Sequence, residues 1–132
     1  MSLLAPVSAG ELLDKITILE IKSERIVDPV KSANVGRELD ALMEIAEREG
    51  LVGVDMNAPL NELRAVNEAL WDVEDALRDH ERRGEFGLRF VELARSVYRH
   101  NDRRAEIKRL INVQVGSMLI EEKSYADYQP VR

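Results

Sequence analysis

The stretch SVYRHNDRRAEIKRLINVQV, residues 96–115, decides both the fold class and the place where a polar site is expected. It has neither proline nor glycine and is rich in residues that favour helices, so it predicts a helix. Apolar Phe90 and Val97 mark the core-facing side of this helix, and apolar residues return on that side at Val115. Between them the same side carries four polar residues: Asn101, Arg104, Lys108 and Asn112. Polar groups therefore interrupt an apolar seam.

The rest of the chain also has helical periodicity. Proline and glycine are sparse, and no run of alternating apolar and polar residues is long enough to predict a sheet. Ser8 is a good N-cap, and Glu11 three residues later completes a capping box. The expected helices begin after Ser8, at Pro29, near Pro59 and at Glu85. We therefore predict an all-α fold, a mostly antiparallel bundle of about four main helices followed by a C-terminal tail.

The last expected helix, residues 85–115, is long for a chain of this size. At a rise of 1.5 Å per residue it would extend roughly 45 Å, more than the width of a compact domain. We therefore expect either a bend near Gly87 or an end that projects from the bundle and meets a partner.

Length and charge limit the classes of function. The chain has 132 residues, which predicts a single helical domain, residues 1–132, with a core at about residues 8–116 and a tail at 117–132. Its formal net charge of −6 disfavours binding to a phosphate backbone, so we expect no nucleic-acid partner. No apolar run approaches the roughly 18 residues that cross a bilayer, so we expect no membrane insertion.

The chain has no cysteine, which excludes disulfides and thiolate metal sites. The start of the chain lacks the charged region of a secretory signal. Both features fit a reducing compartment, and we expect a cytoplasmic protein.

Inward-facing polar residues recur on the third expected helix. Asn67, Glu74 and Glu81 repeat every seven residues, and Arg78 lies in the same sector. The first helix adds Glu20 at the edge of its apolar arc. Because buried charges are normally paired or bind a ligand, we expect these helices and the fourth to converge on one polar cluster. The candidate site residues are Arg104, Lys108, Arg78, Glu74, Asn67, Asn101 and Asn112.

Two interpretations of this cluster remain open, besides a solvated face. In the first, Glu74 pairs with Arg104, the asparagines satisfy the remaining polar groups, and the network fixes the register of the helices. In the second, the excess of Arg and Lys forms a pocket for a small anionic ligand such as a carboxylate or a phosphate. Glu74 would then orient the bases or act as a general base. Whether a reaction is catalysed stays open.

A metal site is a weaker candidate. Paired carboxylates at Glu44 and Glu47, and at Asp72 and Asp75, approach the spacing of helical magnesium-dependent nucleotide pyrophosphatases. Asp72 and Asp75 point away from the apolar stripe of their helix, and such spacings arise often in a chain with 25 acidic residues. We therefore expect neither a metal nor another cofactor.

Two features suggest contacts with a partner chain. Asp14, Ile18 and Ile21 share a second face of the first helix, so this helix contacts neighbours on two sides, inside the bundle or across a dimer. Tyr125 and Tyr128 in the charged tail indicate that the tail docks, on its own bundle or on a second chain. We expect a homodimer, and the alternative function is a protein–protein interaction module whose buried ion pairs are purely structural.

Four segments together resemble a small bacterial protein family of unknown function. They are GELLDKITILEIKSERI, VNEALWDVEDALRDHE, FVELARSVYRHNDRRAEIKRLIN and GSMLIEEKSYADY, and the resemblance extends over nearly the whole chain. It implies a short all-α domain of bacterial origin, with an association with cell-envelope sugar metabolism. It implies no catalytic residues.

Overall fold

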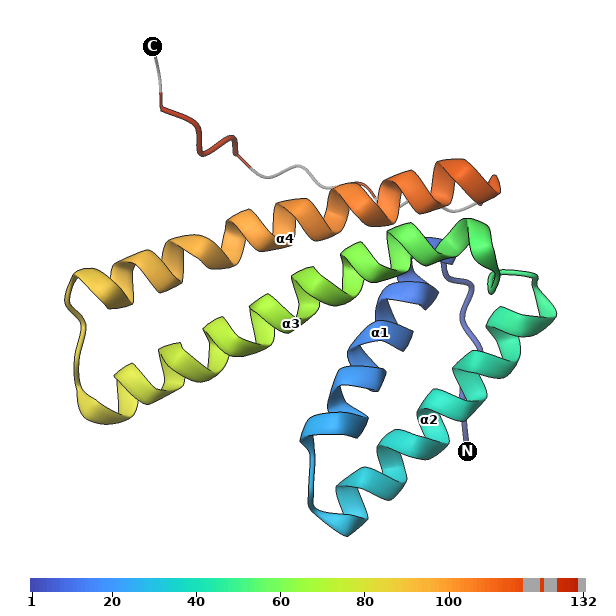
Figure 1. Cartoon of the computed structure of the whole chain (residues 1–132), viewed down its shortest axis with the longest axis horizontal. Coiled ribbons are helices and arrows are strands. Elements are labelled where there is room, and N and C mark those ends of the chain that lie inside the picture. Colours follow the sequence, from blue (N-terminus) through green and yellow to red (C-terminus); the bar gives the residue numbers. More distant parts are fainter. Residues whose placement is uncertain (118–121, 123–125, 131–132) are drawn as a thin grey trace.

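The computed structural model describes residues 1–117, 122 and 126–130 (Figure 1). Its four helices are α1 (Ala9–Arg25), α2 (Pro29–Arg48), α3 (Val54–Arg83) and α4 (Leu88–Val115). No strand occurs in the described residues. The predicted all-α fold is therefore confirmed.

Local capping sets most helix ends. The Ser8 side chain accepts a hydrogen bond from the Glu11 backbone N–H at 3.1 Å and caps α1. Asp28 caps α2 in the same way, and Pro29 occupies its first turn. Gly84 ends α3 in the left-handed conformation, with φ of 66°, which glycine adopts without the penalty of a Cβ.

The expected start of α3 near Pro59 is wrong. The helix begins at Val54, and Pro59 lies inside it. Proline has no N–H for the carbonyl four residues earlier, which belongs to Asp55. The side-chain amide of Gln114, near the end of α4, donates to this carbonyl at 3.2 Å. A contact between helices therefore replaces the missing helical hydrogen bond.

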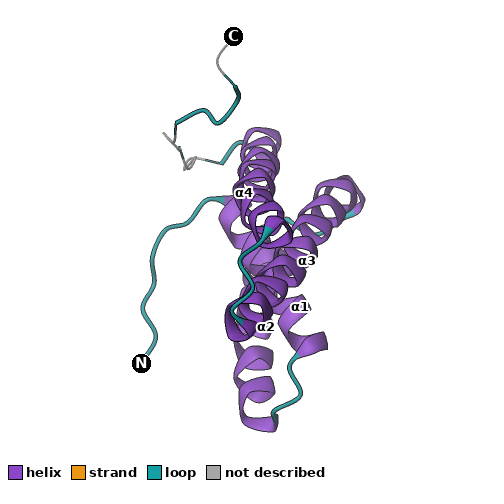
Figure 2. Cartoon of the chain, turned by 90° about the vertical axis from the view of Figure 1, so that its left-hand side faces the viewer, coloured by secondary structure: helices purple, strands orange, loops and turns teal. Residues whose placement is uncertain are grey.

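The helices form two antiparallel hairpins that cross. α1 and α2 make the shorter hairpin, and α3 and α4 make the longer one, which extends far beyond the crossing (Figure 1). α1 packs against α2, α3 and α4, whereas α2 contacts α1 alone among the described helices. Seen along the long hairpin, the two hairpins lie in different directions (Figure 2). The long helix was expected either to bend near Gly87 or to project from the bundle at one end. α4 begins after Gly87, and its first end, at the α3–α4 turn, projects.

The core lies at the crossing. Leu13 of α1, Leu63 of α3, and Ile107 and Ile111 of α4 are at most 1% exposed, and Ala46 of α2 closes one end. Beyond this core the long hairpin is thinly covered. Between residues 71 and 106, all described, Leu93 is the one buried residue. The part of the hairpin from residue 71 to residue 106 is called the distal hairpin below.

The described part of the tail returns along α4. The rings of Tyr98 and Tyr128 lie 4.9 Å apart between centroids, and Arg109 pairs with Glu122. Tyr125, the other tyrosine of the predicted docking segment, lies outside the described residues. None of the helices in the described residues combines the length and the apolar character required to span a bilayer.

Candidate functional site

A buried carboxylate lies where α1 meets α3 and α4. Asp14 is 3% exposed, and its Oδ1 accepts a hydrogen bond from Asn67 Nδ2 at 2.9 Å. The same amide donates to the Thr17 hydroxyl at 2.9 Å. On the other side, Asp14 Oδ2 lies 3.8 Å from Arg104 Nε and 4.0 Å from Lys108 Nζ. α1, α3 and α4 therefore converge on one polar cluster, centred on Asp14.

Two of the predicted site residues lie in the contact between α1 and α4. Lys108 is buried, and its Nζ donates to Glu11 Oε2 at 2.6 Å. Asn112 is 1% exposed, and its Oδ1 accepts from the Gly10 backbone N–H at 2.6 Å. That N–H has no partner within α1, because it belongs to the first turn. Lys108 and Asn112 thus join α1 to α4.

Gly10 permits this close approach. A Cβ at this position would lie 2.4 Å from the backbone carbonyl oxygen of Lys108 and 3.0 Å from Asn112 Oδ1. Since a carbonyl of a helix has little freedom to shift, any side chain at Gly10 would push the helices apart. The distances from Asp14 to Arg104 and Lys108 therefore depend on this glycine.

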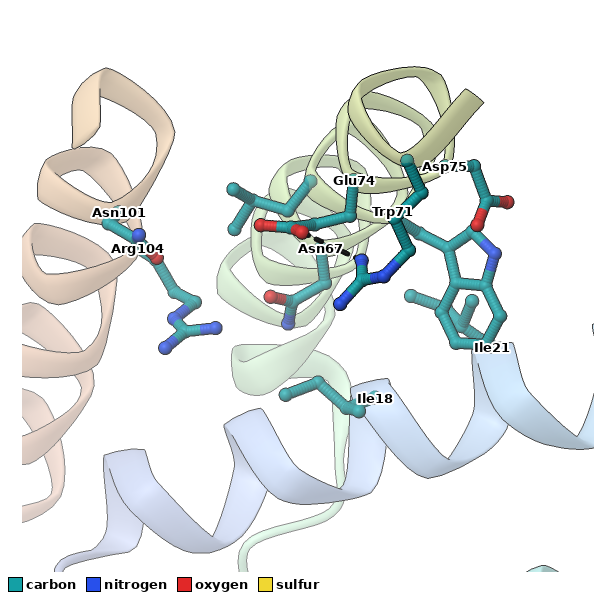
Figure 3. A pocket seen from close by; sticks show the side chains of 10 residues that line it. Ile18, Ile21, Asn67, Trp71, Glu74, Asp75, Asn101 and Arg104 are labelled. Carbon is teal, nitrogen blue, oxygen red and sulfur yellow. Dashed lines mark hydrogen bonds and ion pairs between the residues drawn. The ribbon is translucent and has the colours of Figure 1, made fainter. Parts of the chain in front are cut away.

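An open pocket of about 360 Å³ adjoins the cluster, on the side towards the distal hairpin (Figure 3). This volume is at the lower end of the range of small-molecule sites. α1 supplies aliphatic side chains, α3 supplies Trp71 with acidic and amide groups, and α4 supplies a cationic and an amide group. The lining residues are Ile18, Ile21, Asn67, Leu70, Trp71, Glu74, Asp75, Arg78, Asn101 and Arg104. The lining contains five of the seven predicted site residues; Lys108 and Asn112 are outside it.

The Arg104 side chain reaches from α4 into this pocket (Figure 3). It is 26% exposed, and within the described part of the chain Asp14 is its ion-pair partner. The contact involves Nε at 3.8 Å, which is too long for a hydrogen bond. Within the described residues no hydrogen bond engages the two terminal nitrogens of the guanidinium, so both can donate to a ligand in the pocket.

Glu74 pairs with Arg78 across one turn of α3, at 2.8 Å. A structural network was expected to pair Glu74 with Arg104, but in the described residues Arg104 pairs with Asp14 instead. Arg78 is 75% exposed, so its pair with Glu74 lies at the outer rim. The reason for the difference is that α1 inserts Asp14 between α3 and α4, at the position where Glu74 was expected.

Two ionic contacts hold α1 against α3 beside the pocket. Arg64 of α3 binds Glu20 and Glu24 of α1 at 3.4 and 2.5 Å, and also Glu68 at 2.7 Å. The hydrogen bond from Arg64 lowers the pKa of Glu24, and the hydrogen bonds to Glu24 and Glu68 raise the pKa of Arg64. Glu20, expected at the polar cluster, therefore lies in a separate group.

The second contact is made by Arg25 at the end of α1. Its guanidinium donates to Asp72 Oδ1 at 2.6 Å and lies 5.6 Å from the centre of the Trp71 ring, a cation–π distance. The hydrogen bond to Asp72 raises the pKa of Arg25. Together with the Arg64 group, this contact sets the distance between the aliphatic wall of α1 and the indole of α3.

Sequence reasoning missed Asp14 and Thr17. Asp14 was placed on the second face of the first helix, together with Ile18 and Ile21, so a signal for a buried position existed. Its place near the helix N-terminus suggested a role with the helix dipole instead. The acidic pairs considered for magnesium do not assemble: no cluster of three or more possible metal ligands occurs in the part of the chain that is described.

Comparison with protein families finds a match over nearly the whole chain. A model for a family of unknown function, DUF6165, matches residues 3–131. No match was found among curated proteins or among solved structures.

Proposed function

The chain belongs to this family of unknown function, and we propose that it binds a small anionic ligand in the pocket beside the helix crossing. The position of Arg104 carries this proposal. Its side chain is about three-quarters covered by protein, has one long ion pair among the described residues, and reaches into the pocket. Partly buried arginines of this kind suit planar carboxylates and phosphates, which accept two parallel hydrogen bonds.

Each lining residue has a role in this proposal. Arg104 binds the anion, and the Asn101 amide donates a hydrogen bond beside it. Asn67 lines the pocket but already donates both amide hydrogens, to Asp14 and Thr17, so it acts by orienting Asp14. Arg78, oriented by Glu74, approaches from the rim. Asp14 acts through Arg104 as a positioning residue. Lys108 and Asn112 act through the packing of α1 on α4, so we propose a structural role for them.

Calorimetric titration tests the anion site. The purified chain is titrated with a panel of sugar phosphates and small dicarboxylates, and the best ligand is then titrated into Arg104→Met. Loss of a charged hydrogen-bond donor costs about 1.5–3 kcal/mol, so we expect affinity to fall by roughly ten- to hundredfold. Arg99→Met is the matched control, because Arg99 is exposed on the same helix and does not line the pocket. No heat from any ligand, with Arg104→Met losing only stability, would favour a structural network.

A second candidate function is a protein–protein interaction module that forms a homodimer. The distal hairpin favours it, because two helices that pack only against each other bury little apolar surface. Leu93 is the one buried residue between positions 71 and 106. Leu88 and Val91 add exposed apolar side chains on the distal part of α4. Packing of this hairpin against a second copy would cover them.

Light scattering at several concentrations tests the dimer. We expect a mass of about double the 15.0 kDa of one chain, falling to a single chain in Val91→Asp. Val30→Asp on α2 is the control, since Val30 is 71% exposed and lies outside the distal hairpin. A monomer at all concentrations would refute this candidate and leave the ligand site unaffected.

A cytoplasmic location is also part of the proposal. It is supported by the absence of cysteine, which is typical of proteins that do not depend on an oxidising compartment. Cell fractionation with an antibody to the chain tests it, and recovery in a membrane or exported fraction would contradict it.

A further inference from the structure

The charges that line the pocket are balanced. Arg78 and Glu74 neutralise each other at 2.8 Å. Arg104 is matched by Asp14 behind it, just as Lys108 is matched by Glu11. These residues therefore give the pocket no net positive charge, although Arg104 keeps free donors.

Asp75 adds an acidic group to the pocket lining. It lines the pocket beside Trp71, and in the described residues no ion pair holds its carboxylate. Arg25, which lies over the same indole, is hydrogen-bonded to the neighbouring Asp72 at 2.6 Å, and the charge of Asp75 also helps to raise the pKa of Arg25. In Figure 3, Asp75 and Trp71 lie on one side of the pocket and Arg104 lies on the other. A ligand that carried negative charge at both ends would meet like charge at Asp75.

An apolar surface lies between these two ends. In Figure 3, Ile18 of α1 lies below the space between Arg104 and Trp71, while Asn67 and Glu74 of α3 lie above it. Ile21 and Leu70 add further apolar lining. Such a wall favours the burial of hydrocarbon and gives no hydrogen bonds to a polyhydroxylated chain. The three parts of the wall are thus a donor end, an apolar middle and an acidic end.

We infer that the ligand of this pocket is a zwitterion, with a carboxylate bound by Arg104, an ammonium group next to Asp75, and an apolar segment between them. This inference rests on the proposed function, because it uses the same anion site, and it narrows the ligand from anions in general to ω-amino acids or short apolar peptides. Asn101 donates to the carboxylate end, and Trp71 contacts the hydrocarbon.

Three ligands of equal length test the inference by calorimetry: 6-aminohexanoate, hexanedioate and 1,6-diaminohexane. They share a chain of six carbons and differ in their terminal groups, so that hexanedioate has one methylene fewer than 6-aminohexanoate and the diamine one more. We expect 6-aminohexanoate to bind best, by about threefold over hexanedioate, because Asp75 is exposed and exposed ion pairs are weak. The preference shrinks as salt is raised. In Asp75→Asn, the preference for 6-aminohexanoate over hexanedioate decreases, because the ammonium group loses its partner. Asp79→Asn is the control, since it removes the same charge one turn further along α3, outside the pocket lining.

The possible failures are distinct. If 6-aminohexanoate and hexanedioate bind equally in the unmodified chain and both depend on Arg104, the anion site stands and the zwitterion is refuted. Binding of sugar phosphates without any binding of 6-aminohexanoate would also refute the zwitterion and leave the anion site standing. If no ligand of either panel binds, the proposed function itself fails. If the diamine binds most tightly, the role of Arg104 is refuted in both the proposed anion site and the zwitterion inference.

Discussion

The two halves of the long hairpin differ in what covers them. At the crossing, α1 packs against both α3 and α4, and the side chains of Leu63 and Ile107 are almost fully buried. In the distal hairpin, α3 and α4 contact each other, and Leu93 is the one buried residue among positions 71–106. The pocket lies at the boundary, lined by Leu70 and Trp71 on α3 and by Arg104 on α4. A third helix therefore makes the difference between a seam and a core, and the polar site lies along that helix, between Asp14 and Ile21.

The largest expected effect compares one leucine from each region. Leu63→Ala leaves a cavity in a closed core, and we expect it to lower the free energy of unfolding by about 4 kcal/mol. Leu93→Ala leaves a cavity that neighbouring side chains fill by shifting, and we expect about 2 kcal/mol. Urea denaturation followed by circular dichroism measures both. Equal losses would show that the distal hairpin is as well covered as the crossing, and a loss for Leu93→Ala that depends on protein concentration would identify a second copy as the cover.

Gly10→Ala tests the close approach at the crossing. Because its Cβ would lie 2.4 Å from a backbone oxygen, we expect a loss of about 3 kcal/mol as the helices separate. Gly36→Ala is the matched control: a Cβ added there would meet no other described residue within 4 Å, and alanine in a helix is favoured by about 1 kcal/mol. Thermal unfolding of both variants measures the contrast. A Gly10→Ala chain as stable as the original would contradict the helix packing described for α1 and α4.

Asp14→Asn tests the charge balance of the cluster. Asparagine keeps the shape and the acceptor for Asn67, but it removes the carboxylate that pairs with Arg104 and lies 4.0 Å from Lys108. We expect a loss of about 2 kcal/mol, less than for complete removal of a partner from a fully buried pair. Asp40→Asn, at an exposed position on α2, should change stability by under about 0.5 kcal/mol. Equal effects of the two variants would show that Asp14 is not part of a buried pair.

The smallest effect is a pH dependence at the edge of the crossing. Because the hydrogen bond from Arg64 lowers the pKa of Glu24 below its ordinary 4.5, the folded state binds this proton less readily than the unfolded state. The resulting stability is present above pH 4.5 and is lost as the pH falls through the lowered pKa. Glu24→Gln should therefore unfold at a slightly lower temperature than the original chain near neutral pH, and the two should converge in acid. A constant difference down to acid pH would contradict this origin.

The sequence predicted those features that depend on neighbouring residues. The caps at Ser8 and Asp28 are local, so their sequence signals were sufficient. Pro59 was misleading, because its missing hydrogen bond is replaced by Gln114 from another helix. Asp14 was missed for the same reason: its burial depends on the crossing of α1 with α3 and α4, and the periodicity of one helix does not give a crossing. Arg104 and Lys108 were placed at the cluster because each interrupts an apolar seam, and Asn67 because it lies between the apolar stripe of its helix and Trp71.

The cap on α1 by Asn112 has a consequence for how the protein is made. The hydrogen bond from the Gly10 backbone to Asn112 joins residues 102 positions apart, and the Ala9 backbone N–H donates to Ser117 at 3.3 Å. When the first hairpin leaves the ribosome, the residues that complete its first turn have not yet been synthesised. We expect the nascent chain to acquire its stable structure only after most of α4 has emerged, so that translation speed and chaperone contact in the last third of synthesis control its yield.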